Sequence, residues 1–142
     1  MGQVVEVSPY TSQVLLITDP THAVPVEVNR NGIRSVAGGT GASDLLELEG
    51  VPVTADLREG DLLVSSGLGG RFPRGYPVGR VNSSVIDAAR PFALVTVRPT
   101  ATLDRMRHLL VIFASEFDRP ADAAEDATSG AAHVEGAEGD AP

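Results

Sequence analysis

Cysteine, tryptophan and lysine are absent from this chain of 142 residues, and only 4% of its residues are aromatic. Without cysteine the chain can form no disulfide, no thiol nucleophile and no cysteine-ligated zinc site. Because aromatics are scarce, aliphatic side chains and alanine must fill the core, and a hydrophobic content of 42% is enough for one. No apolar run approaches the roughly 18 residues of a transmembrane helix.

Charge is the second feature, and it is unevenly distributed. Of a formal net charge of −8, residues 118–142 carry seven acids and one arginine, which leaves 12 acids and 10 arginines in residues 1–117. That larger part is nearly neutral and has no basic face, so we expect no nucleic-acid partner. Residues 118–142 cannot bury enough apolar surface to offset the entropy of ordering, and we expect an acidic, disordered tail.

Short runs of β-type residues recur between turn signals, which is typical of an all-β antiparallel barrel or sandwich. Asn31-Gly32 predicts a hairpin with a type I′ turn, because this dipeptide readily adopts positive φ. Before it, valines at 24, 26 and 28 alternate with Pro25 and Glu27, which predicts one buried face, with an edge or bulge at Pro25. The predicted strands are Val4–Val7, Val14–Thr18, Ala23–Val28, Ile33–Ala37, Leu45–Leu48, Leu62–Ser65, Val78–Ser83, Phe92–Val97 and Leu109–Phe113.

Two hairpin-like stretches resemble each other, Gly2–Ile17 and Gly79–Val97. They indicate either two related small barrels or only the general similarity of hairpins. Between the last two predicted strands, Thr102–His108 is suited to a short connecting helix, with Thr100 or Thr102 as its cap and Asp104 in its first turn.

The stretch from Gly60 to Val81 reads GDLLVSSGLGGRFPRGYPVGRV and is dense in glycine and proline. Such residues fix a loop shape that few others can adopt, and the stretch carries no catalytic side chain beyond two serines. We therefore predict a binding surface rather than a catalytic one. Aromatic and arginine side chains are enriched at interface hot spots. The predicted partner-binding residues are Leu68, Arg71, Phe72, Arg74 and Tyr76. An alternative for Phe72 is that it plugs the end of its own barrel, and exposed sheet edges offer a second route to partner binding.

Other functions are weaker alternatives. His22, then Asp56 or Asp61, then Ser65 or Ser66 follow the order of a chymotrypsin-like triad, which would require hydrogen bonds among all three groups. A phosphate-binding loop would need a following helix or a lysine, where this chain has prolines, and three scattered histidines indicate no metal site. A ligand-binding barrel would need more aromatics to line its pocket. We expect no catalytic residues and no cofactor.

The glycine-rich stretch also resembles the signature of the MreC family of rod shape-determining proteins. The resemblance rests on Gly60-Asp61, Ser66–Gly70, Phe72-Pro73, Gly75, Pro77–Gly79 and Val81, with further matches at Gly2–Val4, Ile17–Asp19, Val24–Val26, Thr102-Leu103 and Leu110–Ile112. It implies two small barrels, at residues 1–56 and 57–117, the first lacking strands before Gly2. Full-length members begin with a membrane helix and a coiled coil, so the chain is expected to be part of a longer protein.

What the resemblance implies about function is a non-catalytic scaffold of the bacterial elongation machinery. It would lie at the periplasmic face of the inner membrane and organise peptidoglycan synthesis to maintain rod shape. The implied partners are a class B penicillin-binding transpeptidase, the membrane protein MreD, other elongation-complex proteins and further copies of itself, as a dimer or filament. The chymotrypsin-like hydrolase remains the alternative.

Overall fold

The computed structural model describes residues 1–113, which form eight strands and one short 3-10 helix. In chain order the elements are β1 (Gly2–Val7), β2 (Ser12–Leu16), β3 (Ala23–Val28), β4 (Arg34–Gly39), β5 (Leu46–Glu49), β6 (Leu62–Ser65), η1 (Leu68–Gly70), β7 (Pro77–Val85) and β8 (Leu94–Pro99). The predicted all-β fold class is confirmed, and two of the predicted strands, at 23–28 and 62–65, match β3 and β6 in both bounds.

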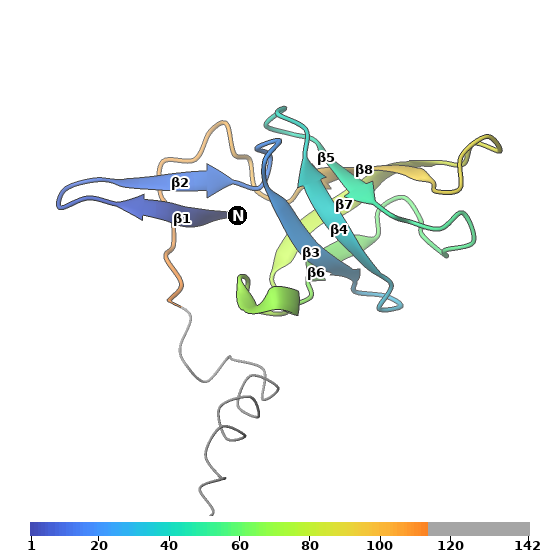
Figure 1. Ribbon diagram of the computed structural model, residues 1–142, viewed down its shortest axis with the longest axis horizontal. Helices are drawn as coiled ribbons and strands as arrows, with labels where there is room; N and C mark the ends of the chain where they lie inside the picture. The colour runs from blue at the N-terminus through green and yellow to red at the C-terminus, as the bar shows by residue number, and fades with distance from the viewer. Residues whose placement is uncertain (114–142) are drawn as a thin grey trace, which may run out of the picture.

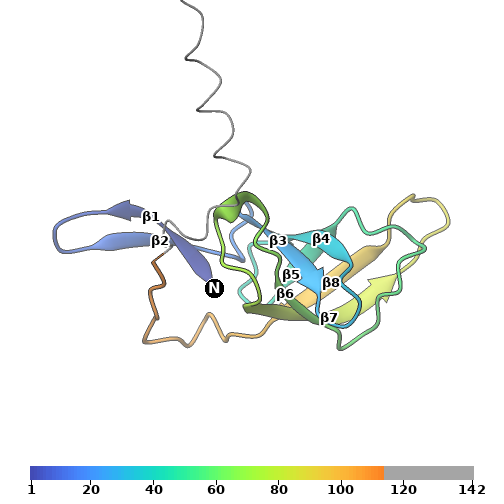
Figure 2. The same ribbon diagram turned by 90° about the horizontal axis from the view of Figure 1, so that it is seen from below.

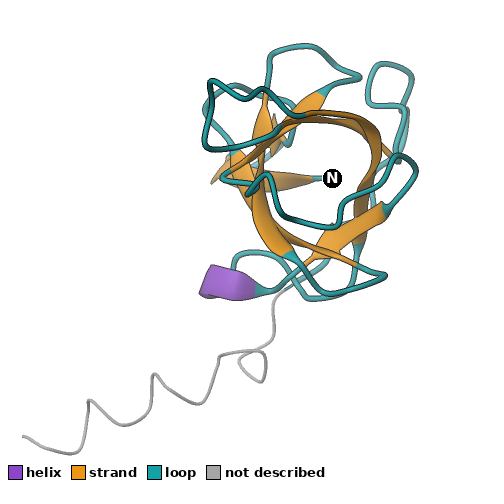
Figure 3. Ribbon diagram, turned by 90° about the vertical axis from the view of Figure 1, so that its right-hand side faces the viewer, coloured by secondary structure: helices purple, strands orange, loops and turns teal. Residues whose placement is uncertain are grey.

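Six strands close into an antiparallel barrel with the order β3-β4-β5-β8-β7-β6 (Figures 1 and 3). Alternation of side chains along each strand decides which residues fill it, since successive side chains point to opposite faces. The valines of β3 are buried as predicted, and Leu46, Leu48, Val95 and Val97 supply the facing strands. The barrel is therefore packed with aliphatic side chains, as the shortage of aromatics requires.

The turn at Asn31-Gly32 joins β3 to β4, but it is not type I′. Gly32 has a positive φ of 73°, while no residue other than glycine does among those described. The Gly32 amide donates to the Val28 carbonyl at 2.7 Å, which gives a longer loop. The Asn31 side chain explains the difference, because its amide donates to the Asp56 carbonyl and its oxygen accepts from the Ile33 amide. Pro25 lies where the β3–β6 pairing ends at Val26, so its missing amide costs no ladder bond.

The strands β1 and β2 form a separate two-stranded sheet that stands beside the barrel (Figures 1 and 2). Their register breaks between Val4 and Glu6, which leaves Val5 as an extra residue. Most of the hairpin is exposed, including Val7 and Tyr10. It is joined to the barrel through Ile17 and Thr18, which are both buried.

Strand pairing differs from the division of residues 1–56 and 57–117 into two barrels. β3 pairs with β6 and β5 pairs with β8, so strands from both sides of residue 56 share one barrel. The two similar hairpins of the sequence have different surroundings, since β7–β8 belongs to the barrel and β1–β2 does not.

Two further predictions are wrong after residue 99. Thr102–His108 forms a turn, with the Arg105 amide donating to the Thr102 carbonyl, and no helix. Leu109–Phe113 is exposed and pairs with no strand among residues 1–113, and the closed barrel has no free edge to which it could add. The predicted acidic tail at 118–142 lies outside the described residues. Among residues 1–113, no helix is long and apolar enough to cross a membrane.

Candidate functional site

The glycine-rich loop between β6 and β7 is organised by Ser65, the last residue of β6. Ser65 is fully buried, and its hydroxyl donates to the Pro73 carbonyl and accepts from the Tyr76 amide at 3.0 Å. Its backbone also closes the loop, because its amide donates to the Tyr76 carbonyl and its carbonyl accepts from the Gly75 amide, each at 2.8 Å. One serine thus holds both ends of the loop together.

Glycine is required inside the loop at Gly67. Its φ is 75°, and a Cβ at this position would lie 3.0 Å from the Cβ of Arg74. A side chain here would be strained by the backbone conformation and crowded by the returning arm of the loop. The turn that follows is the short helix η1, which protrudes from the side of the barrel (Figure 3).

The five predicted site residues divide into three groups. Leu68, Arg71 and Tyr76 are exposed on the loop, and 58% of the Leu68 surface is open. Arg74 is exposed too, but its guanidinium donates to the carboxylate of Glu27 on β3 at 3.2 Å. Phe72 is only 7% exposed and belongs to the barrel core. The prediction that Phe72 lies on the binding surface is therefore wrong. The alternative, in which Phe72 closes the end of its own barrel, describes its position.

His22 lies against that plug, and this pairing was not evident from the sequence. The His22 and Phe72 rings meet edge to face with centroids 5.5 Å apart. The histidine is buried, and neither ring nitrogen has a hydrogen-bond partner among the described residues. Burial lowers the pKa of His22, Asp19 acts in the opposite direction, and Arg71 lowers it further. The sequence did contain a signal for this burial. His22 lies two residues before Val24, so strand alternation places it on the same face as the buried valines of β3.

The groups of the alternative triad are engaged elsewhere. Ser65 serves the loop, and Ser66 accepts from the Leu68 amide at 3.3 Å. Asp56 and Asp61 both bind the Arg30 guanidinium, at 3.1 and 2.9 Å, and this guanidinium lowers the pKa of each carboxyl. The described residues therefore assemble no Ser-His-Asp array. They also contain no group of three residues able to hold a metal ion.

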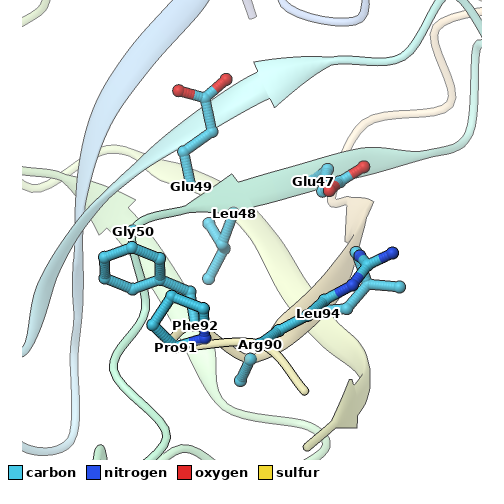
Figure 4. A pocket seen from close by; sticks show the side chains of 9 residues that line it. Glu47, Leu48, Glu49, Gly50, Arg90, Pro91, Phe92 and Leu94 are labelled. Carbon is cyan, nitrogen blue, oxygen red and sulfur yellow. The ribbon is translucent and has the colours of Figure 1, made fainter. Parts of the chain in front are cut away.

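A second surface feature lies at the opposite end of β7, where the sequence predicted nothing. It is a shallow hollow of about 320 Å³ between β5 and the segment leading into β8 (Figure 4). Phe92 and Leu94 line it and are both exposed, and Glu47 and Glu49 stand along the adjoining strand. A sequence signal exists in hindsight, since Gly50 interrupts an alternating Leu-Glu-Leu-Glu run.

Comparison with known proteins places the chain in a family. The family described as rod shape-determining protein MreC, barrel core, matches residues 1–113. The chain is 52% identical over 116 residues to the cell shape-determining protein MreC of Escherichia coli K12, and 49% identical over 118 residues to that of Haemophilus influenzae. These matches cover 82% and 83% of the chain but 32% and 34% of the relatives, so the chain spans about a third of their length.

Solved structures agree with the fold. A crystal structure of MreC from Pseudomonas aeruginosa matches with a TM-score of 0.77 and 59% identity, covering 80% of this chain and 73% of the other. A complex between penicillin-binding protein (PBP2) and MreC from Helicobacter pylori matches with a TM-score of 0.52 and 20% identity, over 66% and 56% of the two chains, which supports the fold alone. With the family model spanning the whole described part of the chain, this protein belongs to the MreC family.

Proposed function

We propose that this chain is a non-catalytic scaffold module of bacterial cell-wall elongation, which binds a class B penicillin-binding transpeptidase through the exposed side of its glycine-rich loop. Relatives named as cell shape-determining proteins, and a relative solved in complex with PBP2, support this function. In the proposal the whole protein acts at the periplasmic face of the inner membrane, together with MreD and further copies of itself.

The observation that carries the proposal is a loop whose shape is fixed from within while its side chains face outward. Ser65 and the buried Phe72 hold the backbone, and Leu68, Arg71 and Tyr76 remain exposed. A surface that is already ordered loses little conformational entropy when a partner binds. Apolar, aromatic and arginine side chains on such a surface are the types that contribute most binding energy. Stoichiometric binding would then bias the position or conformation of the transpeptidase.

The test is a binding measurement between the chain and the purified extracellular domain of the transpeptidase, with Leu68→Ala/Tyr76→Ala as the variant. We expect this variant to weaken binding at least tenfold, which corresponds to about 1.4 kcal/mol. The matched control is Leu110→Ala/Tyr10→Ala, which removes the same two side chains from exposed positions elsewhere and should change the affinity less than twofold. Phe72 is unsuitable for this purpose, because its removal would open the core.

Two results would contradict the proposal in different ways. Absence of any binding by the unmodified chain would contradict the scaffold function as stated for this part of the protein. Binding that both double variants retain would leave the function and exclude the loop as its site. Circular dichroism of each variant must show the spectrum of the unmodified chain for either conclusion.

A further inference from the structure

We infer that the hollow between β5 and β8 is a second docking site, and that it receives a segment of a partner protein that presents an apolar side chain next to a lysine or arginine. The inference goes beyond the proposed function, because it concerns a different face and does not depend on what the glycine-rich loop binds. Three properties of the described residues carry it: the shape of the hollow, its apolar lining and its unbalanced charge.

The shape comes from an irregularity in the pairing of β5 with β8. Leu48 pairs with Val95, but the Ala93 amide donates to the Val51 carbonyl at 2.9 Å, so one extra residue lies on the β5 side. Gly50 absorbs this bulge with a φ of 69°, and a Cβ built there would meet no atom within 4 Å. The space above Gly50 is therefore open because the bulge needs a residue that tolerates positive φ.

The lining is apolar and lies on the outer face of the barrel. Phe92 is about half exposed beside the open space at Gly50, and Leu94 is 40% exposed further along (Figure 4). Leu94 pairs with Val85 of β7, which is also exposed, so the apolar surface continues onto the next strand. Contiguous exposed apolar side chains rimmed by polar ones are typical of interaction sites.

Charge selects the chemistry of the occupant. Glu47 and Glu49 are exposed on the outer face of β5, and neither forms an ion pair with any residue in the described range 1–113. Arg90 also lines the hollow, and its positive charge is balanced by Asp87, whose carboxylate lies 4.0 Å from the Arg90 Nε. Glu47 therefore remains beside the hollow for an incoming cation, while the Glu49 carboxylate adds negative charge on the other side of β5, next to Gly38 of β4 (Figure 4). An apolar side chain in the hollow with a neighbouring basic residue complements both features, whereas an acidic segment would be repelled.

The position of the hollow makes simultaneous binding at the two faces geometrically possible. The glycine-rich loop precedes β7 and the β7–β8 turn follows it, so the two sites lie at opposite ends of this strand (Figures 1 and 2). A module with two such faces can hold two partners at once, and linked binding of this kind raises the effective concentration of one partner near the other.

The experiment is a selection from a displayed library of random peptides against the complete chain, followed by affinity measurement of the selected peptides. We expect peptides with an aliphatic or aromatic residue within two positions of lysine or arginine. Glu47→Arg/Glu49→Arg should weaken their binding at least tenfold, and Phe92→Ser should do the same without reversing any charge. Glu6→Arg/Glu59→Arg reverses two exposed acids elsewhere and should leave the affinity within twofold.

Binding by the expected peptides should also weaken as salt is raised, and should shift the NMR amide signals of Gly50 and Leu94. Selected peptides that are acidic, or whose binding survives both hollow variants, would overturn the inference, as would a selection that enriches nothing. Concentration-dependent dimers that Phe92→Ser abolishes would identify a second copy of the chain as the occupant and would equally overturn it.

Discussion

The barrel strand β3 and the hairpin strand β1 are both rich in valine, but the valines are buried in the barrel and exposed in the hairpin. In β3, alternating valines at 24, 26 and 28 are almost completely buried, whereas in β1 the valines at 4, 5 and 7 are exposed. The difference is closure, because each barrel strand has two neighbours and each hairpin strand has one. An alternating pattern therefore predicts a strand with an apolar face, but the number of neighbours decides whether that face is buried.

The unpaired edges of the β1–β2 sheet make the hairpin the more open of the two regions to association with another chain. A barrel removes free edges, while a two-stranded sheet keeps both of its own and is marginally stable when isolated in water. The exposed segment Leu109–Phe113 adds further unburied apolar surface on the same side of the molecule as the hairpin (Figure 1). The barrel should thus carry nearly all of the folding energy of the described residues.

The largest expected effect separates the two regions by one substitution made in each. Leu63→Ala removes a side chain that is fully buried in the barrel and should lower the free energy of unfolding by about 2–5 kcal/mol. Leu110→Ala removes the same atoms where 98% of the surface is exposed and should change it by less than about 0.5 kcal/mol. Urea unfolding followed by circular dichroism measures both. Equal effects would mean that Leu110 is buried in solution and that the contrast between the regions is false.

The barrel itself was largely predictable from the sequence, for a physical reason. β3 and β6 match the sequence prediction in both bounds because turn residues flank them and apolar side chains alternate or cluster within them. The pairing of the strands was harder to predict. Nothing local in β3 specifies β6 as its neighbour rather than a strand from residues 1–56. Leu109–Phe113 shows the same limit, because its strand propensity does not specify a pairing partner and it pairs with no strand among the described residues.

The glycine-rich loop was predictable as a shaped loop but not in its side-chain directions. The glycines and prolines correctly mark a shaped loop, and Gly67 and Gly75 have the positive φ that such a loop requires. Phe72 was predicted to bind a partner, with a plug of its own barrel as the alternative; it turns inward against His22, and local composition cannot decide between the two. The hollow depends on a bulge between two distant strands, and Gly50 after the alternating run marks only where that bulge lies, not the hollow it opens.

The joint between the two regions offers a test of intermediate size. Gly39 lies at the end of β4, where a Cβ would overlap the backbone oxygen of Asp19 in the connection from β2 to β3. Gly39→Ala should therefore cost about 1–3 kcal/mol, since backbone must shift. Its neighbour gives the matched control. A Cβ at Gly38 would meet the flexible end of Glu49 at 3.1 Å and the Glu47 backbone oxygen at an ordinary contact distance of 3.8 Å, so Gly38→Ala should cost much less. Hydrogen exchange would show whether the amides of Asp19 and His22 lose protection in the first variant alone.

The smallest expected effect is the pH dependence that the buried His22 gives to the free energy of unfolding. Burial lowers the pKa of His22, so the folded chain keeps the ring neutral at pH values where the unfolded chain, with a pKa near 6.5, takes up a proton. The free energy of unfolding should then fall as pH decreases below about 6.5, by at most about 1.4 kcal/mol per pH unit, until the folded pKa is reached. Asp56 and Asp61 have lowered pKa values through Arg30, so their contribution is lost only at lower pH, below about 4.

His22→Phe isolates this term, because it keeps an aromatic ring against Phe72 and removes the titrating group. Burial lowers the pKa of the Met1 amine as well, which gives a slope of the same sign at higher pH, but that slope is common to both proteins. The difference between their unfolding free energies from pH 7.5 to 5 therefore reports His22 alone. Parallel curves would show that the folded protein accepts the proton on His22 as readily as the unfolded chain does. A widening gap at acid pH would show that the buried position against Phe72 disfavours the protonated ring.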